Sequence, residues 1–208
     1  MLAWMTGIDG TVPAIADPTV VKCPGLTVEQ NILNASRGEQ IPFVRVFPDN
    51  WDHRRVCLAL GGEGKACIEE PAIQQLLSDG VAIVSGDLFL TGEYANAEKK
   101  ILGGSGKKYF TTFHYTTDAF RAQDMAHLWQ IALQTAPERT LRAAGCAARA
   151  AACALPLLSG VSGAELEADA LQLSGDADYF ESCFIPGILT LGGLNGCLAL
   201  TEKPVKTF

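Results

Sequence analysis

The side chain best placed for chemistry lies in the segment TLRAAGCAARAAACALPLLSG, residues 140–160. This segment predicts a short strand, a tight turn and then a helix of small residues. A sharp turn between a strand and a helix can hold a nucleophile exposed at its tip. The turn contains no serine, and its one nucleophilic side chain is Cys146. Since a thiolate at a helix N-terminus can attack an acyl group, Cys146 is a candidate catalytic residue.

A nucleophile of this kind needs a base, and the chain has three histidines, His53, His114 and His127. His53 falls in the predicted turn NWDHRR, where we expect it to be solvated. His127 lies among apolar neighbours in a predicted helix, so we expect a packed or surface residue. His114 precedes that helix and could face a ligand, although a solvated or capping role is favoured.

Composition argues against several classes of protein. The chain of 208 residues has a formal net charge of −7 and scattered Lys and Arg residues, which argues against nucleic-acid binding. No long uncharged apolar run predicts a membrane span, and the N-terminus lacks a signal-peptide pattern. The seven cysteines form no CxxC pair, so we expect buried free thiols. No histidine lies at ligand spacing from a cysteine, and we expect neither a metal site nor a cofactor.

The elements that must position the turn alternate between strands and helices. Residues 1–38 are punctuated by Pro and Gly and predict an irregular lead-in, which allows a short helix at 27–36. Strand patterns follow at 41–48, 54–62, 81–90 and 166–175, besides the strand that opens 140–160, and KPVKTF at the end begins one more. Helix patterns occupy 69–80 and 116–137, and the Gly-rich segment 91–112 predicts a loop.

This order predicts a three-layer α/β/α sandwich around a mostly parallel, doubly wound sheet over residues 39–208. Ligands of such sheets bind beyond the carboxyl ends of the strands. The turns that matter are therefore GGEGK at 61–65, GDLFLTGEY at 86–94, GCAAR at 145–149 and SGDADYF at 174–180.

The segments LGGEGKA, GDLFLTGEY, YFTTFHYTTDAFRAQD and YFESCFIPGILTLGGLNGCLAL carry a family resemblance from about residue 40 to 205. Together they resemble α/β-hydrolases related to acetyl xylan esterases. More narrowly, the chain is similar to the second, degenerate hydrolase-like domain of large bacterial carbohydrate-esterase proteins. The resemblance implies an ester-hydrolase scaffold whose nucleophile would sit in the turn at residues 145–149.

Active members of the family carry G-x-S-x-G in this turn. Laid on Gly145–Arg149, the motif puts Ala147 at the serine position and Arg149 at the second glycine, which implies a vestigial nucleophile position. A shift by one residue puts Cys146 at the tip between Ala144 and Ala148, and dienelactone hydrolases use a cysteine there. Both registers stay open at this point.

The rest of the machinery is incomplete by the same resemblance. The family's histidine follows the nucleophile and the acid along the chain, but no histidine follows His127. The chain ends at Phe208, about where the strand before the usual acid begins, so we expect a domain without the last strands. Asp176 and Asp178 could be displaced acids, although loop caps are favoured.

The glycines Gly61, Gly62 and Gly64 resemble the family's turn that offers backbone N–H groups to an oxyanion, although a plain glycine turn is favoured. We expect Asp87 to brace the next turn. An arginine and a glycine often stand in the family at the positions of Phe89 and Leu90, so this rim is apolar. Arg121 and Asp124, three residues apart, are expected to pair or to brace the FTTF loop.

The favoured function is a non-catalytic hydrolase-like domain with a structural or interaction role in a carbohydrate-esterase-type protein. Its expected partner is another segment or chain of the same protein, such as a catalytic esterase domain. An open sheet edge also favours a homo-oligomer. The alternative is an active ester hydrolase that uses Cys146 or a catalytic group from another chain. A carbohydrate-binding module ranks last, because only three tryptophans are present.

Overall fold

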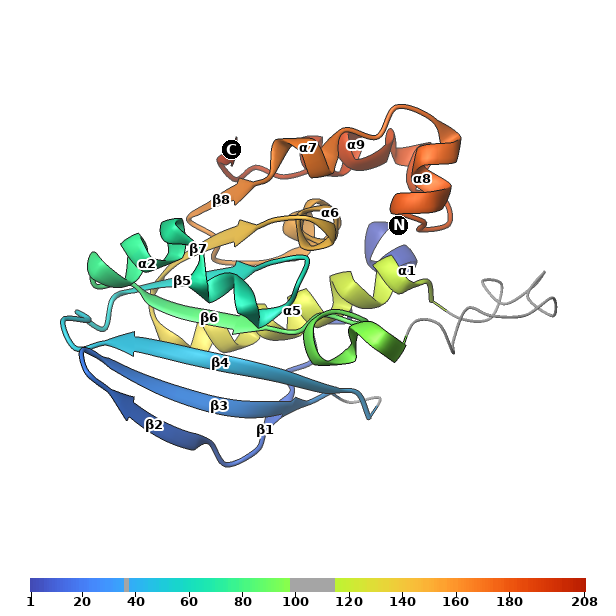
Figure 1. Cartoon of the computed structure of the whole chain (residues 1–208). Helices are drawn as coiled ribbons and strands as arrows, with labels where there is room; N and C mark the ends of the chain where they lie inside the picture. Colours follow the sequence, from blue (N-terminus) through green and yellow to red (C-terminus); the bar gives the residue numbers. More distant parts are fainter. Residues whose placement is uncertain (36–37, 98–114) are drawn as a thin grey trace.

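One mixed sheet of nine strands organises the computed structural model, which describes residues 1–35, 38–97 and 115–208 (Figure 1). The strands are β1 (Ala14–Ile15), β2 (Thr19–Cys23), β3 (Leu26–Asn34), β4 (Gln40–Pro48), β5 (Arg55–Leu60), β6 (Ala82–Gly86), β7 (Glu138–Ala143), β8 (Gly163–Leu166) and β9 (Val205–Thr207). Their order is β1-β3-β4-β6-β5-β7-β8-β9, with β2 also paired to β3. Strands β5 to β9 run parallel to their neighbours within that set, whereas β1 to β4 pair antiparallel, so the sheet is more mixed than the sequence predicts.

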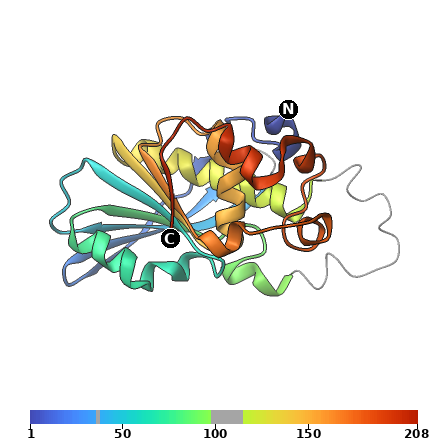
Figure 2. The same ribbon diagram turned by 90° about the horizontal axis from the view of Figure 1, so that it is seen from above.

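Helices cover both faces of the sheet, which confirms the α/β/α class (Figure 2). On one face lie α1 (Leu2–Thr6), α5 (Thr117–Thr135), α6 (Cys146–Ala154) and α9 (Gly193–Ala199). On the other face lies α2 (Pro71–Ser78). The remaining short elements are α7 (Ala168–Leu171), α8 (Asp176–Ser182), η1 (Lys65–Glu69), η2 (Gly92–Ala97), η3 (Leu155–Leu157) and η4 (Ile188–Leu191). Within the described part of the chain, every helix is too short or too polar to cross a membrane.

Burial along the strands follows this coverage. In β5 and β6 almost every residue is buried, as expected of strands covered on both faces. In β7 and β8 buried and more exposed residues alternate, and Thr140 and Glu165 lie exposed. Alternating burial is typical of a strand with one face packed on the core and the other exposed to solvent. Helices therefore cover only one side of the sheet at β7 and β8.

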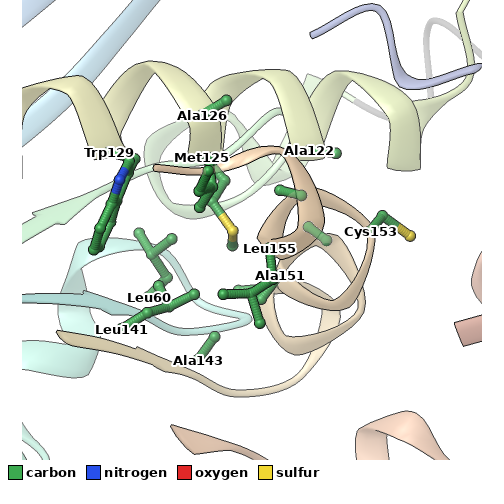
Figure 3. Close-up of a cluster of buried hydrophobic side chains, with 14 of the residues drawn as sticks. Leu60, Ala122, Met125, Ala126, Trp129, Leu141, Ala143, Ala151, Cys153 and Leu155 are labelled. Carbon is green, nitrogen blue, oxygen red and sulfur yellow. The ribbon is translucent and has the colours of Figure 1, made fainter. Parts of the chain in front are cut away.

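The core between the sheet and the main helical layer is built from large side chains on α5 and small ones on α6 (Figure 3). Trp129 and Met125 on α5 are fully buried, and so are Leu60 and Leu141 on the strands. The alanines of α6, among them Ala151, are also fully buried. Small side chains let α6 approach both α5 and the sheet closely, which fixes the position of the turn that precedes α6.

The short helix expected at 27–36 is absent from the described residues of that range, and the expected irregular lead-in is wrong there. Residues Leu26–Asn34 are strand β3, which pairs with β4 along its full length, from Leu26 opposite Pro48 to Asn34 opposite Gln40. Cross-strand pairing and burial of Leu33 outweigh the weak local helix pattern.

The strand expected at 166–175 is also misplaced. Strand β8 ends at Leu166, and Ala168–Leu171 form the short helix α7. Leu166 and Ala170 are both buried, and a spacing of four residues between buried positions is typical of a helix rather than a strand. The other patterns are confirmed at 41–48, 54–62, 69–80, 116–137 and 203–208, whereas the strand expected at 81–90 ends at Gly86. The expected loop at 91–112 begins with η2, and its part from residue 98 onward lies outside the described residues.

Candidate functional site

The strand-to-helix turn has its strained apex at Gly145. Strand β7 ends at Ala143 and helix α6 begins at Cys146, and Gly145 between them has φ 57° and ψ −135°. This backbone conformation is costly for any residue with a side chain. A hydrolase nucleophile stands at just such a strained tip, so the apex position belongs to Gly145.

The apex therefore lies two residues before Ala147, the expected vestigial nucleophile position. Ala147 is fully buried in the first turn of α6. With Gly145 as the centre, the small residues two positions away are Ala143 and Ala147, both fully buried, and they take the places of the two motif glycines. Small residues flank each of the candidate apex positions, so the sequence does not distinguish this register from the other two.

Cys146 lies one residue past the apex, as the first residue of α6, and its side chain is partly exposed. The shifted register that put this cysteine at the tip is thus off by one residue. The position that carries a nucleophile in this type of turn has no side chain in this protein.

The predicted oxyanion-type turn does meet the apex. A Cβ atom added to Gly145 would lie 3.2 Å from the Gly62 Cα and 3.4 Å from the Gly62 nitrogen. A Cβ atom added to Gly62 would lie 3.8 Å from the Cys146 nitrogen. A side chain at the apex would thus point at the Gly62 backbone. The glycine turn after β5 therefore lies directly against the turn before α6.

Asp87 holds the glycine turn in place, as expected. Its buried carboxylate accepts a hydrogen bond from the Lys65 backbone N–H at 2.8 Å and pairs with the Lys65 Nζ at 2.8 Å. It also accepts a hydrogen bond from the Glu93 N–H at 3.3 Å. Burial opposes the charge on Lys65, but its bonds to Asp87 and Glu93 prevail and raise its pKa. A Cβ atom at Gly64 would overlap the Asp87 carboxylate, which explains the third glycine of the turn.

Replacing Asp87 with asparagine is expected to lower the free energy of unfolding by about 2 kcal/mol. The amide nitrogen of asparagine would face an N–H donor, and Lys65, whose side chain is 26% exposed, would lose its buried partner. Urea denaturation measures the change. Glu93→Gln is the control, since the Glu93 side chain is 65% exposed, and should cost no more than about 0.5 kcal/mol. An Asp87→Asn midpoint equal to that of Glu93→Gln would contradict this role.

The next turn is tied to α5. Asp124 accepts a hydrogen bond from the Phe89 N–H at 2.7 Å, and the Arg121 Nε donates to the Phe89 carbonyl at 3.0 Å. Arg121 pairs with Asp118 at 3.3 Å. The two residues predicted to pair with each other thus brace the turn around Phe89 instead, and the FTTF loop lies outside the described residues. Burial raises the pKa of Asp124 to about 8 and also raises that of Asp118.

Glu167 is a residue of the site that the sequence analysis missed. It follows β8 directly, and its carboxylate accepts a hydrogen bond from the Gly145 N–H at 2.6 Å. The sequence signal for this role was an acidic residue directly after a parallel strand. Such a residue lies at the carboxyl edge of the sheet, where the loops of the candidate site also lie. Glu167 fixes the backbone of the apex and places a negative charge beside it.

The described histidines line other parts of the molecule. His53 precedes β5 and packs on Trp51 with 4.3 Å between ring centroids. Since β5 has six residues and the apex lies beyond its far end, roughly 20 Å separates the two ends. His127 lies on α5 at a cavity of about 250 Å³ that also contacts Leu157 and Ser159, past the end of α6 opposite to Cys146. His114 is outside the described residues.

The remaining sequence candidates are structural. Asp178 accepts hydrogen bonds from the Ser174 N–H and hydroxyl at 3.0 and 2.8 Å, which lower its pKa, so it caps the loop before α8. Asp176 lies in the first turn of α8. All seven cysteines are free thiols and five of them are buried. Burial raises the pKa of the Cys57 thiol to about 11, which makes it inert.

The parallel strands, the strained turn and the glycine turn facing it define an α/β-hydrolase fold. Solved structures share it across nearly the whole chain. An acetyl xylan esterase from Thermoanaerobacterium sp. aligns with a TM-score of 0.68 and 10% identity, over 99% of this chain and 75% of that one. A methylesterase aligns with a TM-score of 0.66 and 15% identity, over 99% of this chain and 48% of that one.

An acetyl xylan esterase from Paenibacillus sp. R4 aligns with a TM-score of 0.62 and 10% identity, over all of this chain and 84% of that one. No protein-family model and no curated protein matches the sequence. The structural likeness to acetyl xylan esterases and related esterases confirms the expected relationship at the level of the fold.

Proposed function

We propose that this protein is a non-catalytic α/β-hydrolase-like domain that serves a structural or interaction role in a carbohydrate-esterase-type protein. The observation that carries the proposal is the glycine at the strained apex of the turn. Covalent acyl transfer needs an attacking oxygen or sulfur atom and a base to take its proton. Gly145 supplies no such atom, and its N–H is bonded to Glu167.

The retained features are those that keep the scaffold rigid. Asp87, Asp124 and Glu167 each hold one of the loops at the carboxyl edge of the sheet through a hydrogen bond to backbone N–H. Such bonds stabilise the loops whether or not a substrate binds. A domain selected for shape alone would keep them and lose the nucleophile.

The proposed partner is another segment or chain of the same protein, with a catalytic esterase domain as the leading candidate. Strand β9 pairs with β8 on one side, and within the described part of the chain its other edge carries no strand. An open edge of this kind can accept a further strand, from a partner or from a second copy.

The test is hydrolysis of p-nitrophenyl acetate by the purified chain and by Cys146→Ala. We expect equal rates for the two proteins, and a rate per chain that does not rise with protein concentration. Cys146 should also react with iodoacetamide no faster than the exposed thiol of Cys23.

Two results would overturn the proposal in favour of the active-hydrolase alternative. A rate that falls roughly tenfold in Cys146→Ala, with the fold unchanged by circular dichroism, would identify a thiol hydrolase. A rate per chain that rises with concentration would identify a site completed by a group from another chain.

A further inference from the structure

A small apolar cavity lies between α8 and η4. Figure 1 shows that α8 lies on the side of the molecule opposite to the antiparallel strands. Its volume is about 230 Å³, and its walls include Tyr179, Phe184, Ile185 and Ile188. Cavities that enclose a whole organic ligand are larger, about 300–1,000 Å³. The size therefore suits one apolar side chain of a partner.

The walls of the cavity are fixed by hydrogen bonds to buried groups. The Tyr179 hydroxyl accepts a hydrogen bond from the Leu194 N–H at 2.9 Å. The Asp118 carboxylate accepts one from the Phe184 N–H at 2.9 Å. A cavity held in this way exists before a partner arrives, so a side chain that enters it loses little free energy to reorganisation of the site.

Large apolar side chains stand exposed at the mouth of the cavity. Phe180 is 70% exposed and Leu189 is 45% exposed, and both line the cavity. Phe180 contacts Phe184 with 5.2 Å between ring centroids. Exposed apolar groups gathered around a preformed cavity mark a surface for association rather than a solvated loop.

The charge around the cavity decides which partner fits. Residues 150–202 contain seven acidic residues and no Lys or Arg, so this quarter of the chain holds a charge equal to the whole formal net charge of −7. Three of the seven, Asp176, Asp178 and Glu181, lie on α8, and Asp176 lines the cavity. The three carboxylates on α8 attract cationic segments and repel anionic ones, while Arg121 offsets Asp118, which bonds Phe184, by pairing with it at 3.3 Å.

We infer that the cavity between α8 and η4 docks a polypeptide segment in which one large apolar side chain is flanked by Lys or Arg. The apolar side chain fills the cavity and contacts Phe180 and Leu189, while the cationic side chains lie over the carboxylates of α8. The inference deepens the proposed interaction role by giving the chemistry of the partner. It is tested by binding, so its failure is separate from any finding of esterase activity.

The experiment titrates the full chain into the fluorescein-labelled peptide GKKSLKKG and follows fluorescence anisotropy. We expect binding that weakens roughly tenfold between about 20 mM and about 300 mM salt, because surface charge attraction is screened. The serine twin GKKSSKKG and the acidic twin GEESLEEG should each bind roughly tenfold more weakly, since one lacks the apolar anchor and the other has the wrong charge.

Variants separate this surface from general stickiness. We expect binding of GKKSLKKG to weaken roughly fivefold or more in each of three variants. They are the single changes Phe180→Ala and Leu189→Ala and the double change Asp176→Asn with Glu181→Gln. Matched controls are Val20→Ala on β2 and the double change Asp17→Asn with Asp49→Asn, which alter exposed residues elsewhere and should leave binding unchanged.

Three results would overturn the inference. Equal binding of the acidic and basic peptides would remove the role of charge. Equal binding by the Phe180 variant and the Val20 control would place the peptide elsewhere. Light scattering that finds a dimer which Leu189→Ala dissociates would make a second copy the occupant.

Discussion

Replacing Asp124 with asparagine is expected to stabilise the protein far more at pH 8 than at pH 5. Asp124 is buried on α5 with the Phe89 N–H as a donor, and burial raises its pKa to about 8. In the unfolded chain an aspartate titrates near pH 3.9. The folded state therefore binds a proton that the unfolded state releases between about pH 4 and pH 8.

The sign of the pH dependence follows from this difference. Because the folded state holds more protons, the contribution of Asp124 to the free energy of unfolding is full below about pH 4 and declines as the pH rises toward 8. The loss is about 1.4 kcal/mol per pH unit, or about 4 kcal/mol between pH 5 and pH 8. Asparagine keeps an oxygen for the Phe89 N–H and carries no charge, so its contribution does not decline.

Urea denaturation of both proteins at pH 5 and at pH 8 measures the effect. The quantity to compare is the change in unfolding free energy caused by Asp124→Asn at pH 8 minus the change at pH 5. Titration of all other groups is common to the two proteins and cancels. If Asp124→Asn changes stability by the same amount at both pH values, the carboxylate is ionised in the folded protein and the expectation is wrong.

Truncating Trp129 to alanine should cost about 3–5 kcal/mol of unfolding free energy, which leaves a marginally stable domain at best. Trp129 is fully buried between α5 and the sheet, near Leu60 and Leu141 (Figure 3). Its indole Nε1–H donates to the Ser159 carbonyl at 2.8 Å. The large cavity left by alanine would lie beside α6, whose small side chains have no reach to fill it.

Trp129→Phe separates the two contributions of the indole. Phenylalanine keeps most of the apolar contact and loses the hydrogen bond to Ser159, so about 1–2 kcal/mol is expected. Thermal melts followed by circular dichroism measure all three proteins. Equal losses for the alanine and phenylalanine variants would mean that the hydrogen bond, and not packing, dominates at this position.

The parallel half of the fold could be predicted from sequence because its signals are local. Strands such as 54–62 read as apolar runs, and helix 117–135 carries its own cap, with the Thr116 side chain accepting from the Ala119 N–H. In the antiparallel half only β4 was predicted, from the alternation at 41–48, and β1 to β3 were missed. Strand β3 gains its stability from pairing with β2 on one side and β4 on the other, and its own residues carry only a weak pattern that also suits a helix.

The candidate site could likewise be predicted only where its signals are local in the sequence. Sequence alone found the turn before α6 and the glycine turn after β5, because both are short strand-to-helix connections with Gly. It could not give the register of the apex, since several small residues stand side by side and backbone torsion at Gly145 decides among them. It also missed Glu167, whose role depends on a strand neighbour that only the folded sheet supplies.

The contact between Gly62 and Gly145 bears on how the domain could evolve. A serine codon introduced at position 145 would bring its Cβ within 3.2 Å of the Gly62 Cα, in a backbone geometry that glycine tolerates best. The Gly62 backbone would have to move by a few tenths of an ångström to make room for that Cβ atom. Ester cleavage at this turn would therefore require a nucleophilic side chain at position 145 and a shift of the glycine turn, besides a base to take the proton.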